Sequence, residues 1–133
     1  MEKNKLRLQI ITPLKMILDE EVETVILHTT EGDMGILYDH EPVVALLGYN
    51  VIRYKQDGVL KKATTMGGFA EVTTDSVVIL TDASEFPDDI DVERAAKAKE
   101  RAEGRLSQDS MDKVRAEIAL KKAIVRLNLK EER

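Results

Sequence analysis

The spacing of hydrophobic residues along the chain changes near residue 87. Before that point, short runs alternate apolar and polar positions, as in Leu6-Arg7-Leu8-Gln9-Ile10. This alternation is typical of half-buried β-strands. The same pattern predicts further strands at 21–27, 49–54, 60–66, 69–73 and 77–80. After residue 88, apolar residues recur every three or four positions, and this spacing predicts amphipathic helices.

Turn sequences divide the predicted strands into hairpins. The tripeptides at 56–58 (Gln-Asp-Gly) and 74–76 (Thr-Asp-Ser) each separate two predicted strands. Aspartate and glycine favour such turns because they tolerate the backbone conformations that tight turns require. We expect Gly67-Gly68 to allow a close backbone approach at the start of a strand, rather than to hold an anion. Short strands with frequent turns predict an antiparallel sandwich or barrel.

The last part of the chain predicts two helices joined by a turn at 106–110. The first helix is expected to begin at Asp88, Asp89 or Asp91, which all suit a helix N-terminus, and to run to about Arg105. The inward sides are expected to carry Val92, Ala95, Ala96, Ala102 and Leu106 in the first helix, and Met111, Val114, Ile118, Val125 and Leu129 in the second. Alanine buries little apolar area, so we expect a weakly held hairpin that changes arrangement at low free-energy cost.

Composition supports a division into two domains. Val, Ile and Thr, which favour strands, number 25 in the first 87 residues and 6 in the last 46. We therefore predict an α+β chain, with an antiparallel β-sandwich at 1–86 and a two-helix antiparallel hairpin at 87–133. The 133 residues include no cysteine, no secretory signal and no apolar run of the roughly 20 residues that span a bilayer. The net charge of −5 argues against a nucleic-acid partner.

Side chains that could carry chemistry are scarce. The chain has no glycine-rich phosphate loop and no zinc-protease motif, and its two histidines are His28 and His40. We interpret His28 as a residue at a strand end rather than a metal ligand. For His40, a local hydrogen bond in a loop is the plainer interpretation, and an interface contact is the alternative. No set of nucleophile and base can be assembled, so we expect no catalytic activity.

The predicted hairpin contains one notable group of charged residues. If the helices run antiparallel, Arg94 in the first helix lies near Lys122 and Arg126, which share a face of the second because they are four residues apart. Converging cations bind polyphosphates. The residues alone nevertheless favour a solvated helix, with Asp91 as a cap and a surface Asp91–Arg94 pair that contributes little to stability.

Three segments, in their order and spacing, resemble the epsilon subunit of bacterial-type rotary ATP synthases. They are Glu31-Gly32-Asp33-Met34-Gly35-Ile36-Leu37 with His40 and Pro42, Gly67-Gly68-Phe69-Ala70-Glu71-Val72 with Val77-Val78-Ile79-Leu80, and Arg115-Ala116-Glu117-Ile118-Ala119-Leu120-Lys121-Lys122-Ala123. The resemblance implies a sandwich of about ten strands followed by a helical hairpin. It also implies a non-catalytic subunit in the central stalk of a proton- or sodium-translocating ATP synthase, peripheral to the bacterial plasma membrane on its cytoplasmic side.

The resemblance further implies three protein partners: the gamma subunit, the membrane c-ring and the beta subunit. The sandwich is expected to bind gamma and the c-ring, and the positions carried over for this interface are Glu31, Asp33 and His40. The hairpin is expected to extend and inhibit ATP hydrolysis by pairing basic residues with an acidic segment of beta. The candidates for this contact are Arg115, Lys121, Lys122 and Arg126.

In several bacterial members of this family, the folded hairpin binds ATP through a motif of Ile or Leu followed by Asp-x-x-Arg-Ala. Ile90, Asp91, Arg94 and Ala95 match that motif, and Glu85, Lys122 and Arg126 occupy the other nucleotide-contact positions. The resemblance therefore reverses the preference above and favours ATP as a regulatory ligand; a role for Mg²⁺ stays open. Lys122 stands where arginine is usual, so a lower affinity is expected. Two alternatives remain: a structural coupling subunit that binds no nucleotide, and a stand-alone β-sandwich adaptor.

Overall fold

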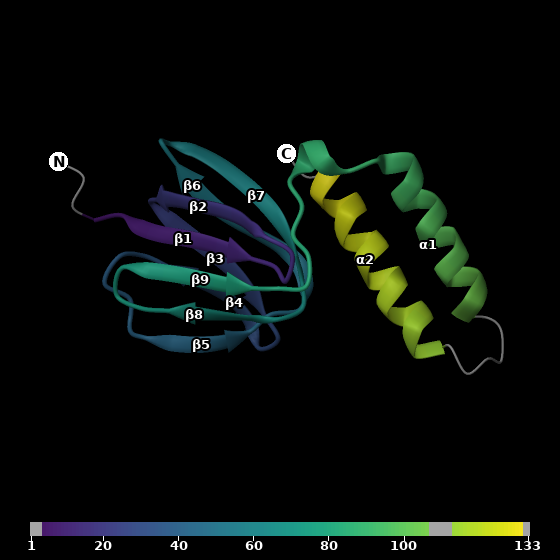
Figure 1. The fold of residues 1–133 in the computed structure, drawn as a ribbon, viewed down its shortest axis with the longest axis horizontal. Helices are drawn as coiled ribbons and strands as arrows, with labels where there is room; N and C mark the ends of the chain where they lie inside the picture. The colour runs from purple at the N-terminus through teal and green to yellow at the C-terminus, as the bar shows by residue number, and fades with distance from the viewer. Residues whose placement is uncertain (1–3, 107–112, 132–133) are drawn as a thin grey trace. The chain divides into compact units, whose positions relative to one another are not determined.

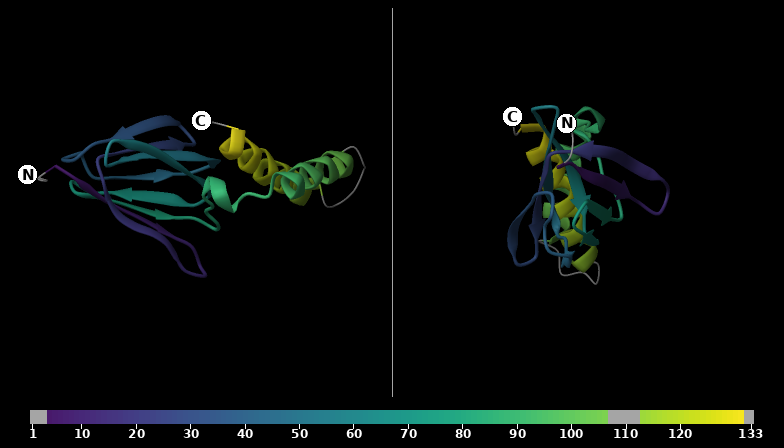
Figure 2. Two further views of the ribbon diagram at one scale, coloured as in Figure 1. Left: turned by 90° about the horizontal axis from the view of Figure 1, so that it is seen from above. Right: turned by 90° about the vertical axis from the view of Figure 1, so that its left-hand side faces the viewer.

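Two stacked β-sheets form the first part of the molecule (Figures 1 and 2). The structure is a computed structural model that describes residues 4–106 and 113–131. The strands are β1 (Leu6–Ile11), β2 (Met16–Val22), β3 (Thr24–Thr29), β4 (Gly32–Ile36), β5 (Val43–Leu46), β6 (Tyr49–Gln56), β7 (Val59–Met66), β8 (Phe69–Val72) and β9 (Ser76–Leu80). The five-stranded sheet has the order β2-β1-β9-β8-β5, and the four-stranded sheet has the order β4-β3-β6-β7.

The predicted fold class, a β-sandwich followed by two helices, is confirmed. The described residues contain nine strands, where the resemblance led us to expect about ten. The single strand expected at 21–27 is divided at Glu23, so that β2 ends and β3 begins there. β4 and β5 were not predicted. Among the described strands, β1 and β9 pair in parallel and the other pairs are antiparallel.

The core of the sandwich is filled by alternate residues of the strands, as the period of two requires. On β1, Leu6, Leu8 and Ile10 are fully buried, while Arg7 between them is exposed. The same alternation buries Val77 and Ile79 on β9. Further core residues are Val22, Val25, Leu27, Ile36, Ile52, Tyr54, Met66 and Val72.

Gly68, directly before β8, confirms the predicted close backbone approach. Its φ is +96°, in the left-handed region that favours glycine. A Cβ added to this residue would lie 1.9 Å from the carbonyl oxygen of Leu80. The chain that follows β9 then runs beside β7, where the backbone N–H of Thr64 donates to the carbonyl of Glu85 (2.9 Å) and the Ser84 hydroxyl donates to the carbonyl of Thr64 (2.7 Å).

The chain divides into two units, Met1–Glu85 and Phe86–Arg133. The second unit contains the 3₁₀ turn η1 (Pro87–Asp89) and the helices α1 (Val92–Leu106) and α2 (Lys113–Glu131), which pack side by side (Figure 1). Of the three candidate caps, Asp91 caps α1, because its Oδ1 accepts the backbone N–H of Arg94 at 3.1 Å. Asp89 instead accepts the N–H of Phe86 (3.0 Å) and closes η1.

Alanines form the contact face of the helix pair. The buried residues of α1 are Ala95 and Ala102, seven positions apart, and α2 buries Ala116 and Ala123 at the same spacing. Residues seven apart lie on one side of a helix, so we call these four residues the alanine seam. An alanine-lined inner face was predicted for α1, and the structure extends it to α2.

Several of the larger apolar residues expected on the inner faces lie elsewhere. Val114 and Ile118 are 68% and 36% exposed, because each is two positions from Ala116 and therefore points to the opposite side of α2. Val92 and Ala96 are also exposed. Val125 and Leu129 are buried, but Val125 is two positions from Ala123 and therefore also points away from the alanine seam. Met111 and most of the turn expected at 106–110 lie outside the described residues.

Candidate functional site

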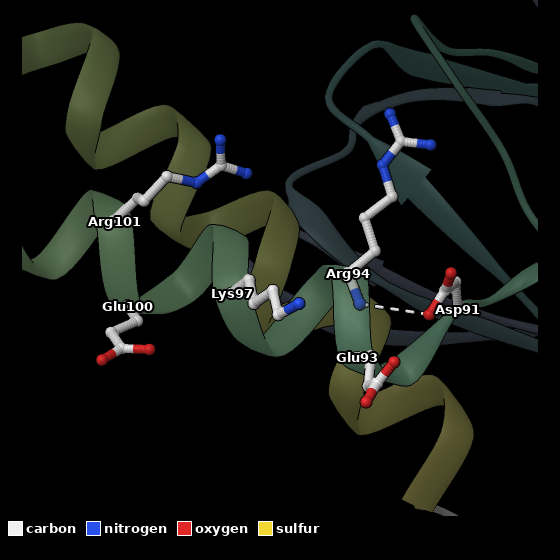
Figure 3. Close-up of a pocket in the computed structure, with 6 residues that line it drawn as sticks. All are labelled: Asp91, Glu93, Arg94, Lys97, Glu100 and Arg101. Carbon is white, nitrogen blue, oxygen red and sulfur yellow. Dashed lines mark hydrogen bonds between the residues drawn. The ribbon is translucent and has the colours of Figure 1, made fainter.

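A hollow of about 830 Å³ lies along the first turns of α1. Its described lining consists of Asp91, Glu93, Arg94, Lys97, Glu100 and Arg101 (Figure 3). In Figure 3, Arg94 and Arg101 extend to one side of the helix, and Glu93 and Glu100 point to the other. The Arg94 side chain is exposed and makes no hydrogen bond or ion pair with the described residues. The expected Asp91–Arg94 contact is therefore a backbone cap, and the guanidinium stays available to an anion.

The residues predicted to contact ATP are distributed over both units. Asp91 and Arg94 line the hollow, and their neighbours Ile90 and Ala95 are buried at 7% and 4% exposure. Lys122 and Arg126 lie one turn apart on α2 and are half-buried, and neither belongs to the described lining. Glu85 belongs to the sandwich unit, where its backbone N–H donates to the Thr64 hydroxyl at 2.9 Å.

The cations predicted to contact the beta subunit form a stripe along α2. Arg115, Lys122 and Arg126 are separated by seven and four residues, so all three lie within about 20° of one line along the helix. We call them the basic stripe. Lys121 lies about 120° from that line and is exposed. A partner that contacts the basic stripe would therefore meet Lys121 only at its margin.

The predicted c-ring contact lies on the tight turn between β3 and β4. Glu31 and Asp33 are both exposed there, and we call the segment 30–33 the acidic turn. The Thr29 hydroxyl donates to the carbonyl of Gly32 (2.7 Å) and accepts the backbone N–H of Glu31 (3.1 Å), which holds the turn in one conformation. His40 lies in the loop after β4 and is half-buried, with its Nδ1 2.7 Å from the carbonyl oxygen of Glu41. This contact is the local hydrogen bond of the plainer interpretation.

Asp33 has a partner that sequence reasoning missed. Its carboxylate contacts Nδ1 of His28, directly opposite on β3. Nε2 of the same ring lies 2.8 Å from Nη1 of Arg53 on β6. The strand register brings the three groups together: a two-residue turn pairs position 28 with position 33, and Arg53 is opposite Ile26 on the same face. The spacing of His28 and Asp33 across a short turn was the available signal, but Arg53 is 25 residues away.

Apolar residues cross the outer face of the five-stranded sheet in one row. The register aligns Met16 with Ile11, Ile11 with Leu80, Leu80 with Phe69, and Phe69 with Leu46. We call these five residues the apolar row. Leu46, Met16 and Phe69 are 64%, 47% and 39% exposed. A continuous apolar row on an exposed sheet face is typical of a protein-binding surface.

Two titratable groups of the sandwich are clearly perturbed. Arg7 donates from Nε and Nη2 to the two carboxylate oxygens of Asp19 (2.9 and 2.8 Å), and this hydrogen bonding holds the pKa of Asp19 below its ordinary value. The same contact raises the pKa of Arg7. Burial raises the pKa of Tyr54, with a smaller contribution from the charge of Glu20. The described residues contain no cluster of three His, Asp or Glu side chains suited to a metal ion.

Comparison with protein families accounts for both units of the chain. The model for the beta-sandwich domain of the ATP synthase delta/epsilon chain matches residues 5–87, and the model for its long alpha-helix domain matches residues 88–131. The chain belongs to the ATP synthase delta/epsilon chain family. Membership makes it a non-catalytic subunit of the ATP synthase, which confirms the resemblance noted in the sequence.

Curated relatives of the family match almost the whole chain. The ATP synthase epsilon chain of Symbiobacterium thermophilum is 47% identical over 90% of this chain and 88% of its own length. The epsilon chain of Alkaliphilus metalliredigens is 48% identical over 95% of this chain and 96% of its own length. Neither described helix is both long and apolar enough to cross a bilayer.

Solved structures of ATP synthases contain chains with the same fold. A chain in the Euglena gracilis mitochondrial ATP synthase structure of OSCP, F1 and c-ring has a TM-score of 0.81 and 30% identity, covering 90% of this chain and 78% of that one. A chain in the central stalk and c-ring structure of the Tetrahymena thermophila mitochondrial synthase has a TM-score of 0.64 at 14% identity, covering 98% and 99%. The second likeness concerns the fold alone. The chain is an epsilon-type subunit of the central stalk.

Proposed function

We propose that this subunit couples rotation between the catalytic head and the membrane ring, with its sandwich bound to the gamma subunit through the apolar row. The exposure of that row is the observation that carries the proposal. Each side chain of this size contributes about 1.5–3 kcal/mol when it passes from full exposure to burial. Leu46, Met16 and Phe69 are partly exposed and Ile11 and Leu80 less so, and their complete burial by one partner would therefore supply a few kcal/mol of binding free energy.

A pair of variants tests the docking surface. Leu46→Glu places a charge at the end of the apolar row, and we expect it to weaken binding to purified gamma at least ~10-fold, because burying an unpaired carboxylate costs several kcal/mol. The matched control is Leu60→Glu on β7, since Leu60 and Leu46 are 62% and 64% exposed. Loss of gamma binding in both variants, or in neither, would contradict docking on the apolar row.

For the acidic turn, we propose a contact with the membrane c-ring, which would place the subunit at the cytoplasmic side of the plasma membrane as a peripheral protein. Glu31 and Asp33 supply exposed carboxylates on a turn that its own hydrogen bonds hold rigid. A preorganised turn loses little conformational entropy on binding. We expect Glu31→Gln to weaken c-ring binding in a salt-dependent way, and unchanged binding at low salt would contradict the contact.

We further propose that the hairpin inhibits ATP hydrolysis when it opens and that ATP stabilises its closed form. The alanine seam supports an opening hairpin, because alanine side chains bury little area. The basic stripe supports contact with an acidic segment of the beta subunit. A ligand that binds the closed form alone would stabilise it by ~2.7 kcal/mol at a hundredfold excess over its Kd. That is enough to reverse a two-state equilibrium of small bias.

Arg94 at the hollow could contact a polyphosphate without disturbing the cap of α1. Asp91 already occupies the backbone N–H of Arg94, so phosphate oxygens would not displace this cap. The guanidinium of Arg94, with Lys122 and Arg126 from α2, would supply the positive charge instead. ATP bound there would bridge the two helices and hold the hairpin closed.

Titration of the full-length protein with ATP tests the sensor. Arg94→Ala should weaken binding by about tenfold to a hundredfold, the range for losing one charge-assisted hydrogen bond. Arg101→Ala is the control, because Arg101 lines the same hollow but is outside the predicted site. Lys122→Arg should strengthen binding by restoring a bidentate donor. Absence of binding at millimolar ATP in all four proteins would favour the structural coupling subunit.

A further inference from the structure

Three polar groups from three adjacent strands meet on the outer face of the four-stranded sheet. Asp33 on β4, His28 on β3 and Arg53 on β6 form a continuous chain of contacts, with the imidazole in the middle. The His28 side chain is 16% exposed and that of Asp33 is 70% exposed. The chain of contacts therefore connects an exposed carboxylate of the acidic turn to the interior of the sheet face. We call it the 33–28–53 relay.

The contacts define where the protons lie. Arginine has only N–H donors, so Nε2 of His28 must accept the hydrogen bond from Nη1 of Arg53. The single proton of the ring is then on Nδ1, where it donates to the Asp33 carboxylate. These contacts are those of a neutral imidazole with its proton on Nδ1. A second proton on Nε2 would remove the acceptor that Arg53 uses.

Positive charges on β6 and on β7, the next strand beyond it, oppose that second proton, whereas the carboxylates of the acidic turn favour it. Arg53 on β6 contacts the ring directly, and Lys62 on β7 lies opposite Arg53 in the register. The Nζ atom of Lys62 is buried without a hydrogen-bond partner among the described residues. On the other side, Asp33 and the nearby Glu31 favour an imidazolium. Protonation would therefore strengthen the contact with β4 and break the contact with β6.

We infer that protonation of His28 switches the side chains behind the acidic turn between two hydrogen-bonding states, and we call this switch the latch. With the neutral ring, Arg53 is bound to His28 and the Asp33 carboxylate keeps its negative charge toward solvent. With the charged ring, Arg53 leaves and the imidazolium neutralises Asp33 at contact distance. The relay then changes from zero net charge to +1, and the turn loses attraction for a cationic partner. This consequence rests on the proposed c-ring contact, whereas the latch itself does not.

NMR of the full-length protein tests the latch directly. Long-range ¹⁵N spectra should show the Nδ1–H tautomer while the His28 ring is neutral, and the Nε–H signal of Arg53 should move as His28 takes up its second proton. His28→Gln supplies a neutral donor and acceptor that cannot be protonated, so its Arg53 signal should not follow pH. An Nε2–H tautomer, or an Arg53 signal that ignores the titration of His28, would overturn the inference. The wild-type spectra decide this even if the variant does not fold.

Binding to detergent-purified c-ring at a series of pH values tests the consequence. Wild-type affinity should fall about fivefold as His28 becomes charged, the upper range for one exposed charge pair, and His28→Gln should show no such fall. The variant retains His40, so a response from that residue would appear in both proteins. An equal fall in both would overturn control by His28. Absence of binding by both at every pH would refute the proposed c-ring contact, while the NMR result would still decide the latch.

Discussion

Substitution of Gly68 by alanine tests the tightest backbone contact of the sandwich. The new Cβ would lie 1.9 Å from the carbonyl oxygen of Leu80 and 2.9 Å from the Cα of Thr81. Real Cβ atoms stay at least 3.0 Å from such neighbours, so the backbone must move by about 1.1 Å at a point where β8 pairs with β9. No flexible side chain can absorb this shift, because the obstructing atoms belong to the main chain.

Three contributions determine the expected change in the free energy of unfolding, and two of them are destabilising. The left-handed φ of Gly68 adds about 1–2 kcal/mol of strain for a residue with a Cβ. Overpacking in a well-packed region adds about 1–3 kcal/mol. Alanine also restricts the unfolded chain, which offsets about 0.4–1 kcal/mol. We therefore expect Gly68→Ala to reduce the free energy of unfolding of the sandwich by about 1–5 kcal/mol, a large fraction of the ~5–15 kcal/mol typical of a domain.

Tyrosine fluorescence during urea unfolding measures this quantity for the sandwich alone. The chain has no tryptophan, and its three tyrosines, Tyr38, Tyr49 and Tyr54, all belong to the sandwich unit. The signal therefore reports the sandwich transition without a contribution from the hairpin. A lower midpoint at an unchanged slope would mean that stability changed and the two-state transition did not.

Alanine substitutions at two other glycines distinguish the cost of backbone strain from the cost of steric overlap. Gly67 has a φ of +75° but its nearest neighbour, Tyr49 Cε1, is 3.9 Å from an added Cβ, so Gly67→Ala should lose only the ~1–2 kcal/mol of backbone strain, less the same ~0.4–1 kcal/mol offset from the unfolded chain. Gly35 has an ordinary φ and no atom within 4 Å, so Gly35→Ala should be close to neutral. If Gly68→Ala loses no more stability than Gly67→Ala, the close-approach explanation is wrong.

Three further predictions follow from individual contacts. Because burial raises the pKa of Tyr54, the unfolded phenol ionises first, so the urea midpoint should fall as pH rises above about 10, and Tyr54→Phe should remove this part of the fall. Because Arg7 lowers the pKa of Asp19 in the folded protein, the Asp19 carboxylate stabilises the fold at pH values above 3.8, its pKa in the unfolded chain. This stabilisation is lost as the pH falls through the lower pKa of the folded protein, so the loss of stability in acid should be smaller in Arg7→Gln. Ala102→Leu should overpack the alanine seam and destabilise the helix pair by about 1–3 kcal/mol, seen as faster hydrogen exchange in α1 and α2 with unchanged tyrosine fluorescence.

Local sequence signals predicted the elements whose causes are local. The Asp57-Gly58 turn forms where the tripeptide indicated, because both residues adopt positive φ angles. Asp91 was among three expected caps, and the choice between them depended on where the backbone leaves η1. Turn and capping preferences act over three or four residues, so the sequence alone carries most of this information.

Features that depend on a partner far away in the sequence were missed, because turn and capping signals carry no information about that partner. β4 begins in a stretch that resembles a loop, and its strand character comes from pairing with β3. Val114 and Ile118 have the spacing of an inner helix face, yet the smaller Ala116 and Ala123 occupy it, because helices approach more closely over alanine. Periodicity shows that a helix has two faces, and the neighbouring helix selects which one is buried.

The α+β division of the chain, the hairpin turns and the family signature could therefore be predicted from the sequence alone, since each depends on residues that are close together in sequence. The apolar row and the 33–28–53 relay arise from strand register. Met16 and Leu46 belong to one surface because five strands lie in a particular order, and Arg53 reaches His28 because β6 pairs with β3. Arg53 and His28, 25 residues apart in sequence, come into contact only because backbone hydrogen bonds align their strands. That alignment is a property of the folded sheet.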